Sequence, residues 1–364
     1  MEQKKKKKHM SIKVTILFIV ILLLIFGIYY IMRKLNSNEY KLEQIGYKNN
    51  EISVITTNNT YLDYALNNNY NEKLVEFINN ESFKIEFFDS YLSYYQNNHN
   101  VPISDIIYLV NNDINYEYSE TLMNFTKEKY FLKTRIERYF SYLESHNDLS
   151  YKEVVKRVNS DIDYDFYTNI EDTDMSYNEL IICNKHYKLD STYTPNNLVT
   201  IENKYAKSYL GQVDSTTYEA YKKMANKMAE ENLHLLIQSP YRSYVSQDSI
   251  YNGYVKKDGK SLADTYSARP GHSEHQTGLA IDFATNKTTG LSNSEFGVTN
   301  EFKWLQDHAH EYGFILRYPK GEEYITGYMY ESWHYRYVGV DVATTIHNEN
   351  ITYEEYFTYY VLKK

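Results

Sequence analysis

Two short stretches of the sequence contain residue types that bind metal ions and transfer protons. Residues 269–282 hold two histidines and two carboxylates among glycines and small residues, and residues 331–334 (Glu-Ser-Trp-His) add one more of each. Two imidazoles and one carboxylate, with a fourth position left for water, form the ligand set of a catalytic zinc site. A further carboxylate beside such a site can accept a proton from the bound water. The candidate metal ligands are His275, Asp282 and His334, and the candidate acid/base is Glu331.

The spacing around Asp282 predicts a strand that presents this carboxylate to an ion. Residues 278–283 alternate between large apolar and small side chains, and Asp282 falls on the face with the small ones. His275 lies just before this strand. Taken alone, a His and an Asp seven positions apart are usually surface residues, so the pair by itself is weak support for a metal site. In an extended chain His334 and Glu331 point to opposite faces, so a turn or bulge is required for both to reach one ion.

Arg242 is the candidate cation of the site. It follows a predicted strand at residues 233–238 and precedes a predicted helix at residues 245–254, with Gln247 on the first helical turn. A guanidinium fork binds two carboxylate oxygens at once, so an arginine at a strand end suits the recognition of a carboxylate. The alternative is an arginine in a surface salt bridge, which spacing alone favours.

Further elements are expected around these residues. Periodicity predicts helices at 216–232 and 301–312, and short strands at 179–183 and 314–317. His308 and His310 fit the surface of the second helix better than a ligand role. Val338, Val340 and Val342 alternate as a continuing apolar strand.

Composition and charge limit the class of protein. The 364 residues are 42% hydrophobic and 24% charged, as in ordinary globular proteins. The net charge is −9, but residues 1–34 carry eight basic residues and one acidic residue, which leaves −16 on the remainder. So acidic a remainder argues against a nucleic-acid partner. The only cysteine, Cys183, excludes an internal disulfide and a cysteine-rich zinc site.

An apolar segment near the N-terminus predicts a membrane anchor. Residues 14–32 are almost wholly apolar, and about 19 residues at roughly 1.5 Å each span a bilayer core. The lysine run before the segment exceeds the basic pair after it, so we expect a cytoplasmic N-terminus and an extracellular catalytic domain. A cleavable signal peptide is the alternative, but residues 35–38 (Leu-Asn-Ser-Asn) match a cleavage site poorly.

Residues 35–168 are poor in Gly and Pro and contain an internal repeat. Phe77 matches Phe125, Phe83 matches Phe131, and residues 91–94 match 139–142, each 48 positions later. A period of this length is typical of helical units that bury their apolar faces on one another. Residues 46–55 resemble a truncated earlier copy. We favour a spacer over a module that binds the cell wall or a partner.

The expected domain organisation follows from these segments. It comprises a cytoplasmic basic tail (1–13), a transmembrane anchor (14–32), a helical repeat region (35–168), a turn-rich linker (169–178), a catalytic domain (179–342) and a C-terminal tail (343–364).

Both chemical stretches resemble a known family. The pattern Ser-x-His-x-x-Gly-x-Ala-x-Asp at 273–282 and Glu-x-Trp-His at 331–334, with Tyr-Arg-Ser upstream at 241–243, is similar to the VanY-type zinc D-alanyl-D-alanine carboxypeptidases. The wider group includes D,D-dipeptidases, L,D-carboxypeptidases and Hedgehog-like folds. The resemblance covers about 160 residues, from near Glu179 to Gly339.

The resemblance implies a small α+β domain with a central antiparallel sheet. It implies zinc held by the three candidate ligands, and Glu331 as the base. It places Arg242 at the substrate's terminal carboxylate or scissile carbonyl, with Ser273 and Gln247 lining the site. Pro240 stands where a glycine is common and Ser332 where a proline is common, and neither change removes a functional atom.

The expected function is removal of the terminal D-alanine from peptidoglycan stem peptides. An L,D-carboxypeptidase acting on tetrapeptides is the first alternative, because the motifs do not reveal the stereochemistry of the penultimate residue. A non-catalytic module that binds cell wall ranks lower, because Glu331 and Arg242 are both present. A sensor or scaffold built on the repeats stays open.

Overall fold

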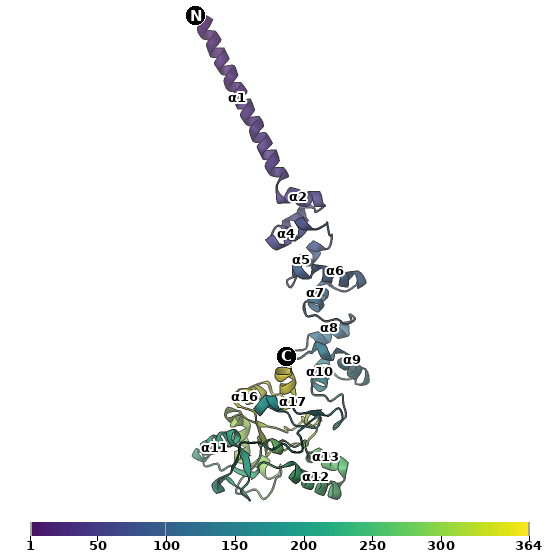
Figure 1. The fold of residues 1–364 in the computed structure, drawn as a ribbon, viewed down its shortest axis with the longest axis vertical. Coiled ribbons are helices and arrows are strands. Elements are labelled where there is room, and N and C mark those ends of the chain that lie inside the picture. The colour runs from purple at the N-terminus through teal and green to yellow at the C-terminus, as the bar shows by residue number, and fades with distance from the viewer. Residues whose placement is uncertain (1, 99, 363–364) are drawn as a thin grey trace. The chain divides into compact units, whose positions relative to one another are not determined.

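The computed structural model describes residues 2–98 and 100–362, with the backbone alone for residues 2–13. Met1 of the expected basic tail and residues 363–364 of the expected C-terminal tail lie outside the described residues. The chain forms two compact units, residues 1–123 and 124–364, whose helices are labelled in Figure 1. The predicted domain bounds stay a prediction. The structure groups the residues from 124 to 168 with those expected to be catalytic.

The first helix, α1 (Glu2–Leu35), contains the apolar segment. Its part from Val14 to Leu35 contains an 18-residue stretch with a mean hydropathy of 2.9, and no residue of that stretch is buried. A helix of this length and composition can cross a membrane, and a signal sequence near the N-terminus meets the same criteria.

The remainder of the first unit is helical. Its elements are α2 (Asn38–Ile45), α3 (Asn49–Ile55), α4 (Asn59–Asn67), α5 (Leu74–Ile78), the 3-10 helix η1 (Ile85–Phe87), α6 (Phe88–Asn97) and α7 (Ile103–Asn111). Helix α8 (Glu120–Thr126) spans the change from one unit to the next. The second unit begins with η2 (Lys133–Arg135), α9 (Ile136–Ser145) and α10 (Tyr151–Asn159).

The segments predicted to repeat contain the same elements. Helices α6 and α9 begin 48 residues apart, as do α7 and α10. Within the first segment the Tyr91 hydroxyl donates to Asn111 Oδ1 at 2.5 Å, and within the second Tyr139 donates to Asn159 Oδ1 at 2.7 Å. Each tyrosine also stacks on a buried phenylalanine, Phe77 or Phe125.

A four-stranded antiparallel sheet lies at the centre of the second unit. Its strands, in spatial order, are β5 (Leu236–Ser239), β6 (Ala280–Ala284), β8 (His334–Tyr337) and β7 (Phe314–Leu316). The α+β class and the antiparallel sheet therefore agree with the prediction, while the more specific Hedgehog-like fold stays a prediction. Two short two-stranded sheets accompany it, β1 (Glu171–Asp172) with β2 (Tyr187–Lys188) and β3 (Leu198–Thr200) with β4 (Gln212–Asp214).

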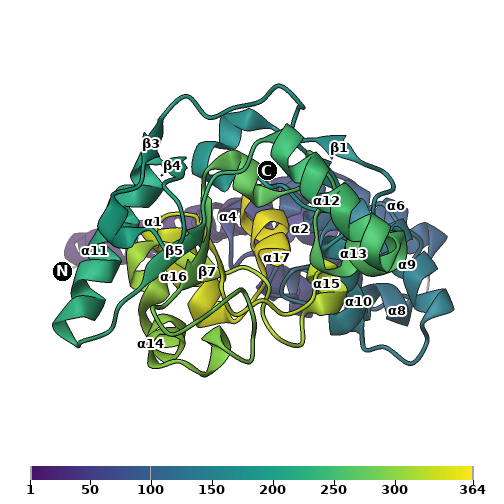
Figure 2. The ribbon, with the colours of Figure 1, turned by 90° about the horizontal axis from the view of Figure 1, so that it is seen from below.

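Helices pack against one face of this sheet, and Asp282 lies on the other face. Helix α11 (Ser215–Glu230) and the pair α12 (Tyr244–Asp258) and α13 (Lys260–Tyr266) lie on opposite sides of the unit (Figure 2). Apolar side chains of α11 and α14 (Asn300–His308) form one buried cluster with Ile281 and Phe283 of β6. Because side chains alternate along a strand, Asp282 points away from this cluster. The same alternation that buries the core thus directs the carboxylate to the other face.

Two predicted strands are wrong. Residues 175–180 form the 3-10 helix η3 (Met175–Leu180), and residues 181–183 are irregular. The side chains of Ile181, Ile182 and Cys183 are buried, but their backbone pairs with no strand among the described residues. Strand β8 ends at Tyr337, and Val340 begins helix α16 (Val340–Glu349) after Gly339, whose φ is +85°. Short apolar runs do not distinguish a strand from a buried helix or loop.

The C-terminal segment is folded. Helices α16, α17 (Tyr353–Tyr356) and the π-helix η8 (Phe357–Val361) bury Tyr353 and Phe357 against Ile315 of β7. Glu354 of α17 accepts two hydrogen bonds from Arg317, at 2.5 and 2.9 Å. Remaining short elements are η4 (Asn203–Tyr205), η5 (Glu274–Thr277), η6 (Phe296–Val298), η7 (Ala309–Tyr312) and α15 (Glu323–Thr326).

Ending the chain at Asn350 should abolish the stable folding of the second unit. Without Glu354, the buried charge of Arg317 would lose a partner, which lowers the free energy of unfolding by about 3–5 kcal/mol. The loss of two buried aromatic side chains lowers it by about 3–5 kcal/mol for each. This loss is comparable to the whole stability of a domain. Thermal unfolding followed by circular dichroism should show no cooperative transition, whereas a chain ending at Val361 should unfold like the full chain. Equal transitions for the two truncations would contradict the integral role of α17.

Candidate metal centre and its cleft

Strand pairing brings the second imidazole to the carboxylate. Asp282 of β6 lies opposite His334 of β8 and, on its other side, opposite Ser239 of β5. His275 lies in η5, one short turn before β6. That turn ends at Gly278, whose φ is +73° and where a Cβ would lie only 3.0 Å from Leu198 and 3.2 Å from the Asp214 nitrogen. Glycine is therefore required for the chain to return from His275 into β6.

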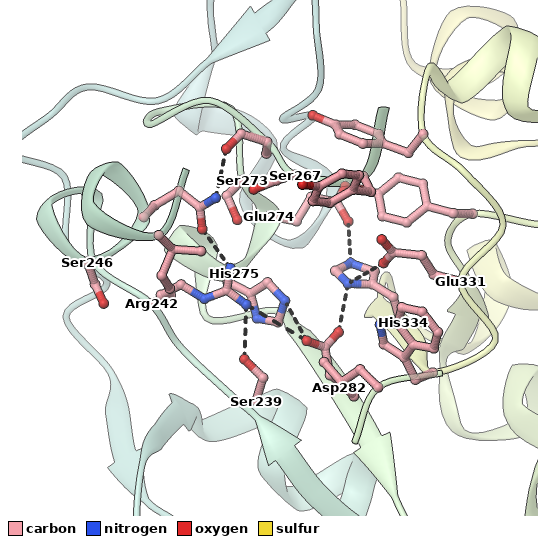
Figure 3. Close-up of a pocket in the computed structure, with 18 of the residues that line it drawn as sticks. Ser239, Arg242, Ser246, Ser267, Ser273, Glu274, His275, Asp282, Glu331 and His334 are labelled. Atoms are coloured by element: carbon pink, nitrogen blue, oxygen red, sulfur yellow. Dashed lines mark hydrogen bonds and ion pairs between the residues drawn. The ribbon is translucent and has the colours of Figure 1, made fainter. Parts of the chain in front are cut away.

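The three candidate ligands converge on one point (Figure 3). Asp282 Oδ2 lies 3.2 Å from His275 Nε2, and Asp282 Oδ1 lies 2.9 Å from His334 Nδ1. One donor atom from each residue lies within 4.8 Å of the other two, and all three residues are buried. Burial alone would raise the pKa of Asp282, but the two imidazoles hold it well below its ordinary value.

The outer face of His275 supports a metal-binding tautomer. His275 Nδ1 lies 2.8 Å from the backbone oxygen of Pro240, which can only accept, so Nδ1 carries the proton and Nε2 is left with a lone pair for a metal ion beside Asp282. Such a partner on the other ring nitrogen is the usual companion of a metal-bound histidine. Burial and the nearby Arg242 lower the pKa of His275, which also favours the neutral ligand form. A donor set of two imidazole nitrogens and one carboxylate fits zinc.

Glu331 reaches the same point through a turn. The backbone nitrogen of His334 lies 3.4 Å from the Glu331 oxygen, so the chain turns just before β8 begins. Glu331 Oε2 lies 3.8 Å from His334 Nδ1 on the side facing the cleft. Burial raises the pKa of Glu331 to about 8. The contact between the His334 nitrogen and the Glu331 oxygen is the turn that the sequence analysis required for both side chains to reach one ion.

Arg242 lies on the opposite side of Asp282. Its Nη2 is 3.8 Å from Asp282 Oδ2 and donates to Ser239 Oγ at 3.0 Å, while Nη1 donates to Gln247 Oε1 at 2.6 Å. Gln247, which is 1% exposed, donates its own Nε2 to the Ala268 oxygen at 2.7 Å. The amide of Gln247 is thus engaged in holding the guanidinium, so it supports Arg242 more directly than it meets a substrate.

Replacing Arg242 with lysine should impair the peptide cleavage expected from the sequence without loss of metal. A lysine ammonium cannot keep the contacts to Ser239 and Gln247 while also presenting a planar fork. We expect kcat/KM to fall about 100-fold, as for loss of a charge-assisted contact in the transition state. Steady-state kinetics with metal content measured in parallel checks this. Arg157→Lys on α10 is the matched control and should leave kcat/KM unchanged. Equal activity of both variants would exclude a role for Arg242 in cleavage.

A cleft of about 730 Å³ opens over these residues. It is lined by the ligands, Glu331, Arg242 and Ser273, and by aromatic side chains that include Tyr241, Tyr254, Tyr318 and Trp333. Ser273, as expected, lines the cleft, although it is only 4% exposed. A concave site with aromatic walls and a few convergent polar groups suits a small ligand such as a peptide end.

Sequence reasoning missed a buried charge network behind the site. Glu274, between Ser273 and His275, accepts from Arg317 Nε at 2.9 Å and from Arg336 Nη1 at 3.0 Å, and none of the three side chains is exposed. Burial alone would raise the pKa of Glu274, but the two guanidinium groups hold it well below its ordinary value. Three charged residues far apart in sequence give no periodic signal. Only the adjacency of Glu274 to His275 could have suggested its role.

Together, the α+β fold and this centre define a metal-dependent hydrolase. Comparison with known proteins agrees. A family model described as VanY, D-alanyl-D-alanine carboxypeptidase, matches residues 211–340. The chain is 41% identical over 186 residues to YodJ of Bacillus subtilis, a protein named as a carboxypeptidase, covering 50% of this chain and 67% of YodJ.

Two further similarities extend this result. VanXYC of Enterococcus gallinarum, named as a bifunctional D-Ala-D-Ala dipeptidase and D-Ala-D-Ala carboxypeptidase, is 32% identical over 184 residues, with 50% of this chain and 95% of VanXYC covered. The solved structure of the LdcB LD-carboxypeptidase has a TM-score of 0.50 and 37% identity, covering 54% of this chain and 94% of LdcB. The chain belongs to the VanY D-alanyl-D-alanine carboxypeptidase family. It is accordingly a zinc metallopeptidase, and the resemblance and cofactor expected from the sequence are confirmed.

Proposed function

We propose that this protein removes the terminal D-alanine from peptidoglycan stem pentapeptides as a D,D-carboxypeptidase. The observation that carries the proposal is the convergence of His275, Asp282 and His334 with Glu331 on one side and Arg242 on the other, at the base of one cleft. Membership of the VanY family supports the substrate class, because VanXYC is named for activity on D-Ala-D-Ala.

The proposed chemistry assigns each residue a task. His275, Asp282 and His334 would hold zinc, which when bound supplies Lewis-acid activation of a water and of the peptide carbonyl. Glu331 accepts a proton from the attacking water, whose oxygen forms a bond to the carbonyl carbon ahead of the terminal D-alanine. The C–N bond then breaks, and Glu331 returns the proton to the leaving amine nitrogen. Arg242 holds the substrate's terminal carboxylate or the oxyanion that develops from the carbonyl.

The masses of products from defined stem peptides test this proposal. The full chain in detergent should convert a pentapeptide stem to a tetrapeptide and free D-alanine, and a chelator should stop the reaction. A pentapeptide that stays intact in the presence of zinc would refute D,D-carboxypeptidase activity.

An L,D-carboxypeptidase is the second candidate function. The similarity to the LdcB LD-carboxypeptidase, at 37% identity, favours it. In this case a tetrapeptide stem would lose its terminal D-alanine and yield a tripeptide. Incubating both stems side by side separates the two functions, because each predicts a different product mass from a different substrate.

We also propose that α1 is an uncleaved anchor that keeps the catalytic domain outside the cell membrane. The exposed apolar helix and the lysine run before it support this topology. Mass spectrometry of the mature protein should find the N-terminal residues retained. Protease added to intact cells should digest residues after 35 and spare those before 14.

The helices between residues 35 and 168 are proposed to be repeat units that act as a spacer. The matched helix bounds and the equivalent Tyr–Asn hydrogen bonds in the two segments support the repeat. A role as a wall-binding module, sensor or scaffold predicts that deleting residues 35–123 changes the wall phenotype even when the catalytic unit is otherwise retained at the membrane. A spacer predicts a smaller effect, which a linker of similar length should restore.

A further inference from the structure

The nitrogen of His334 that faces away from the candidate metal points at Glu274. His334 Nε2 lies 3.7 Å from Glu274 Oε2, and both atoms are buried (Figure 3). Neither atom has a hydrogen-bond partner among the residues that the structure describes. Buried polar atoms without partners are rare and costly. Two such atoms facing each other can satisfy one another through a small movement of the ring.

Glu274 itself is held firmly from the other side. Its Oε1 accepts from Arg317 and from Arg336, so Oε2 is the oxygen left for His334. The side chains of Glu274, Arg317 and Arg336 are all 0% exposed. A carboxylate fixed by two guanidinium groups in a dry interior cannot turn away to solvent.

The two arginines are fixed in turn by separate parts of the chain. Arg317 forms a paired contact with Glu354 of α17, and Arg336 donates to the backbone oxygens of Glu179 and Ile181 at 3.0 and 2.8 Å. Glu354 is buried as well, and Asn184 donates to it at 3.2 Å. The network therefore connects the residue that follows β7, strand β8, helix α17 and the segment before β2 to one carboxylate beside His334.

A metal-binding histidine needs this kind of partner. For Nδ1 of His334 to offer its lone pair beside Asp282, the ring proton must lie on Nε2. A carboxylate that accepts this proton selects the tautomer and fixes the plane of the ring. His275 has its equivalent partner in the Pro240 oxygen, whereas in the described structure Glu274 is what faces the outer nitrogen of His334.

We propose that Glu274 is a positioning residue of the zinc centre, accepting the Nε2 proton of His334 and holding Nδ1 towards the metal. The inference deepens the proposed function and rests on its zinc site. The arginine pair holds the carboxylate in place, and Glu354 anchors Arg317 from the C-terminal helix.

The test compares zinc affinity in two variants that each remove one buried negative charge from the network. Glu274→Gln keeps the shape of the side chain, but its amide can turn an N–H towards His334 and favour the wrong tautomer. Glu354→Gln removes a charge of the same cluster without touching His334. Zinc dissociation constants are measured on the full chain in detergent by competition with a chromophoric chelator, and thermal unfolding of the zinc-free proteins is measured in parallel.

The proposal predicts a 10- to 100-fold weaker zinc affinity for Glu274→Gln, the range typical of lost outer partners of metal ligands. Glu354→Gln should weaken zinc binding less than about threefold, even though its unfolding temperature should fall about as much as that of Glu274→Gln. Equal losses of affinity in both variants, or wild-type affinity in a folded Glu274→Gln protein, would overturn the proposal.

A second variant covers the case in which Glu274→Gln does not fold. Glu274→Asp preserves the charge that both arginines need but withdraws the carboxylate by one methylene from His334. It should fold, and its zinc affinity should nevertheless be at least 10-fold weaker than that of the wild type; unchanged affinity would overturn the role of Glu274. These measurements use zinc alone, so a failure here leaves wild-type cleavage of stem peptides intact. A wild-type chain that binds no zinc would instead refute the proposed function and this role with it.

Discussion

Glu331→Gln should reduce kcat by about 1,000-fold while zinc stays bound. General acid–base groups typically contribute 10²–10⁴-fold to a rate, and Glu331 is proposed both to accept the proton of water and to deliver it to the amine. The glutamine has nearly the same volume and lies beside the ligands rather than among them, since Glu331 Oε2 is 3.8 Å from His334 Nδ1. Single-turnover rates on a stem peptide, with zinc content measured on the same sample, give the result.

The matched control for this variant is Glu311→Gln. Glu311 is half-exposed and pairs with His308, outside the residues that line the cleft. Its substitution removes a carboxylate of the same kind and should leave kcat within about twofold, as expected for a surface change. A Glu331→Gln protein that cleaves at the rate of this control would exclude Glu331 as the base.

His334→Ala should lose zinc and, with it, all measurable cleavage. The substitution removes one of the three proposed protein ligands, so the fall in zinc affinity should exceed the roughly 100-fold that lost outer partners can cause. It also leaves Asp282 without the imidazole at 2.9 Å and Glu274 without a group to face. Metal analysis after dialysis against zinc-free buffer, followed by a peptidase assay with added zinc, measures both effects.

His272→Ala is the corresponding control because it comes from the same stretch of chain. His272 is buried, and its Nδ1 contacts the Asn184 oxygen at 2.7 Å, away from the candidate ligands. This variant should lose some stability yet keep its zinc. If His272→Ala lost zinc and His334→Ala retained it, the ligand assignment would be refuted.

Much of the candidate site could be predicted because its residues lie in two short segments. His275 and Asp282 are separated by one turn and the first residues of β6. The alternation of large and small side chains along this strand therefore predicted that the carboxylate lies on the face opposite Ile281 and Phe283. Helices α11, α12 and α14 were also predictable, because each shows periodicity or a capping side chain such as Asp214 or Ser243.

The features that could not be predicted from the sequence depend on contacts between distant segments. Glu274, Arg317 and Glu354 form one buried network, but single charged residues in a sequence give no sign of their eventual partners. Val340 and Val342 continue an apolar alternation, and only the positive φ of Gly339 turns the chain into α16. The C-terminal residues then become part of the core through Phe357 and Tyr353, which the sequence alone could not assign to any neighbour.

Anomalous scattering at the zinc absorption edge, from crystals of the zinc-loaded protein, tests the metal centre most directly. We predict one strong peak between His275, Asp282 and His334, at roughly 2.0–2.2 Å from one atom of each, with Glu331 beside it and unbound. A zinc ion found elsewhere, or a folded protein whose three side chains hold no metal in the presence of zinc, would contradict the assignment of this cleft as a peptidase site.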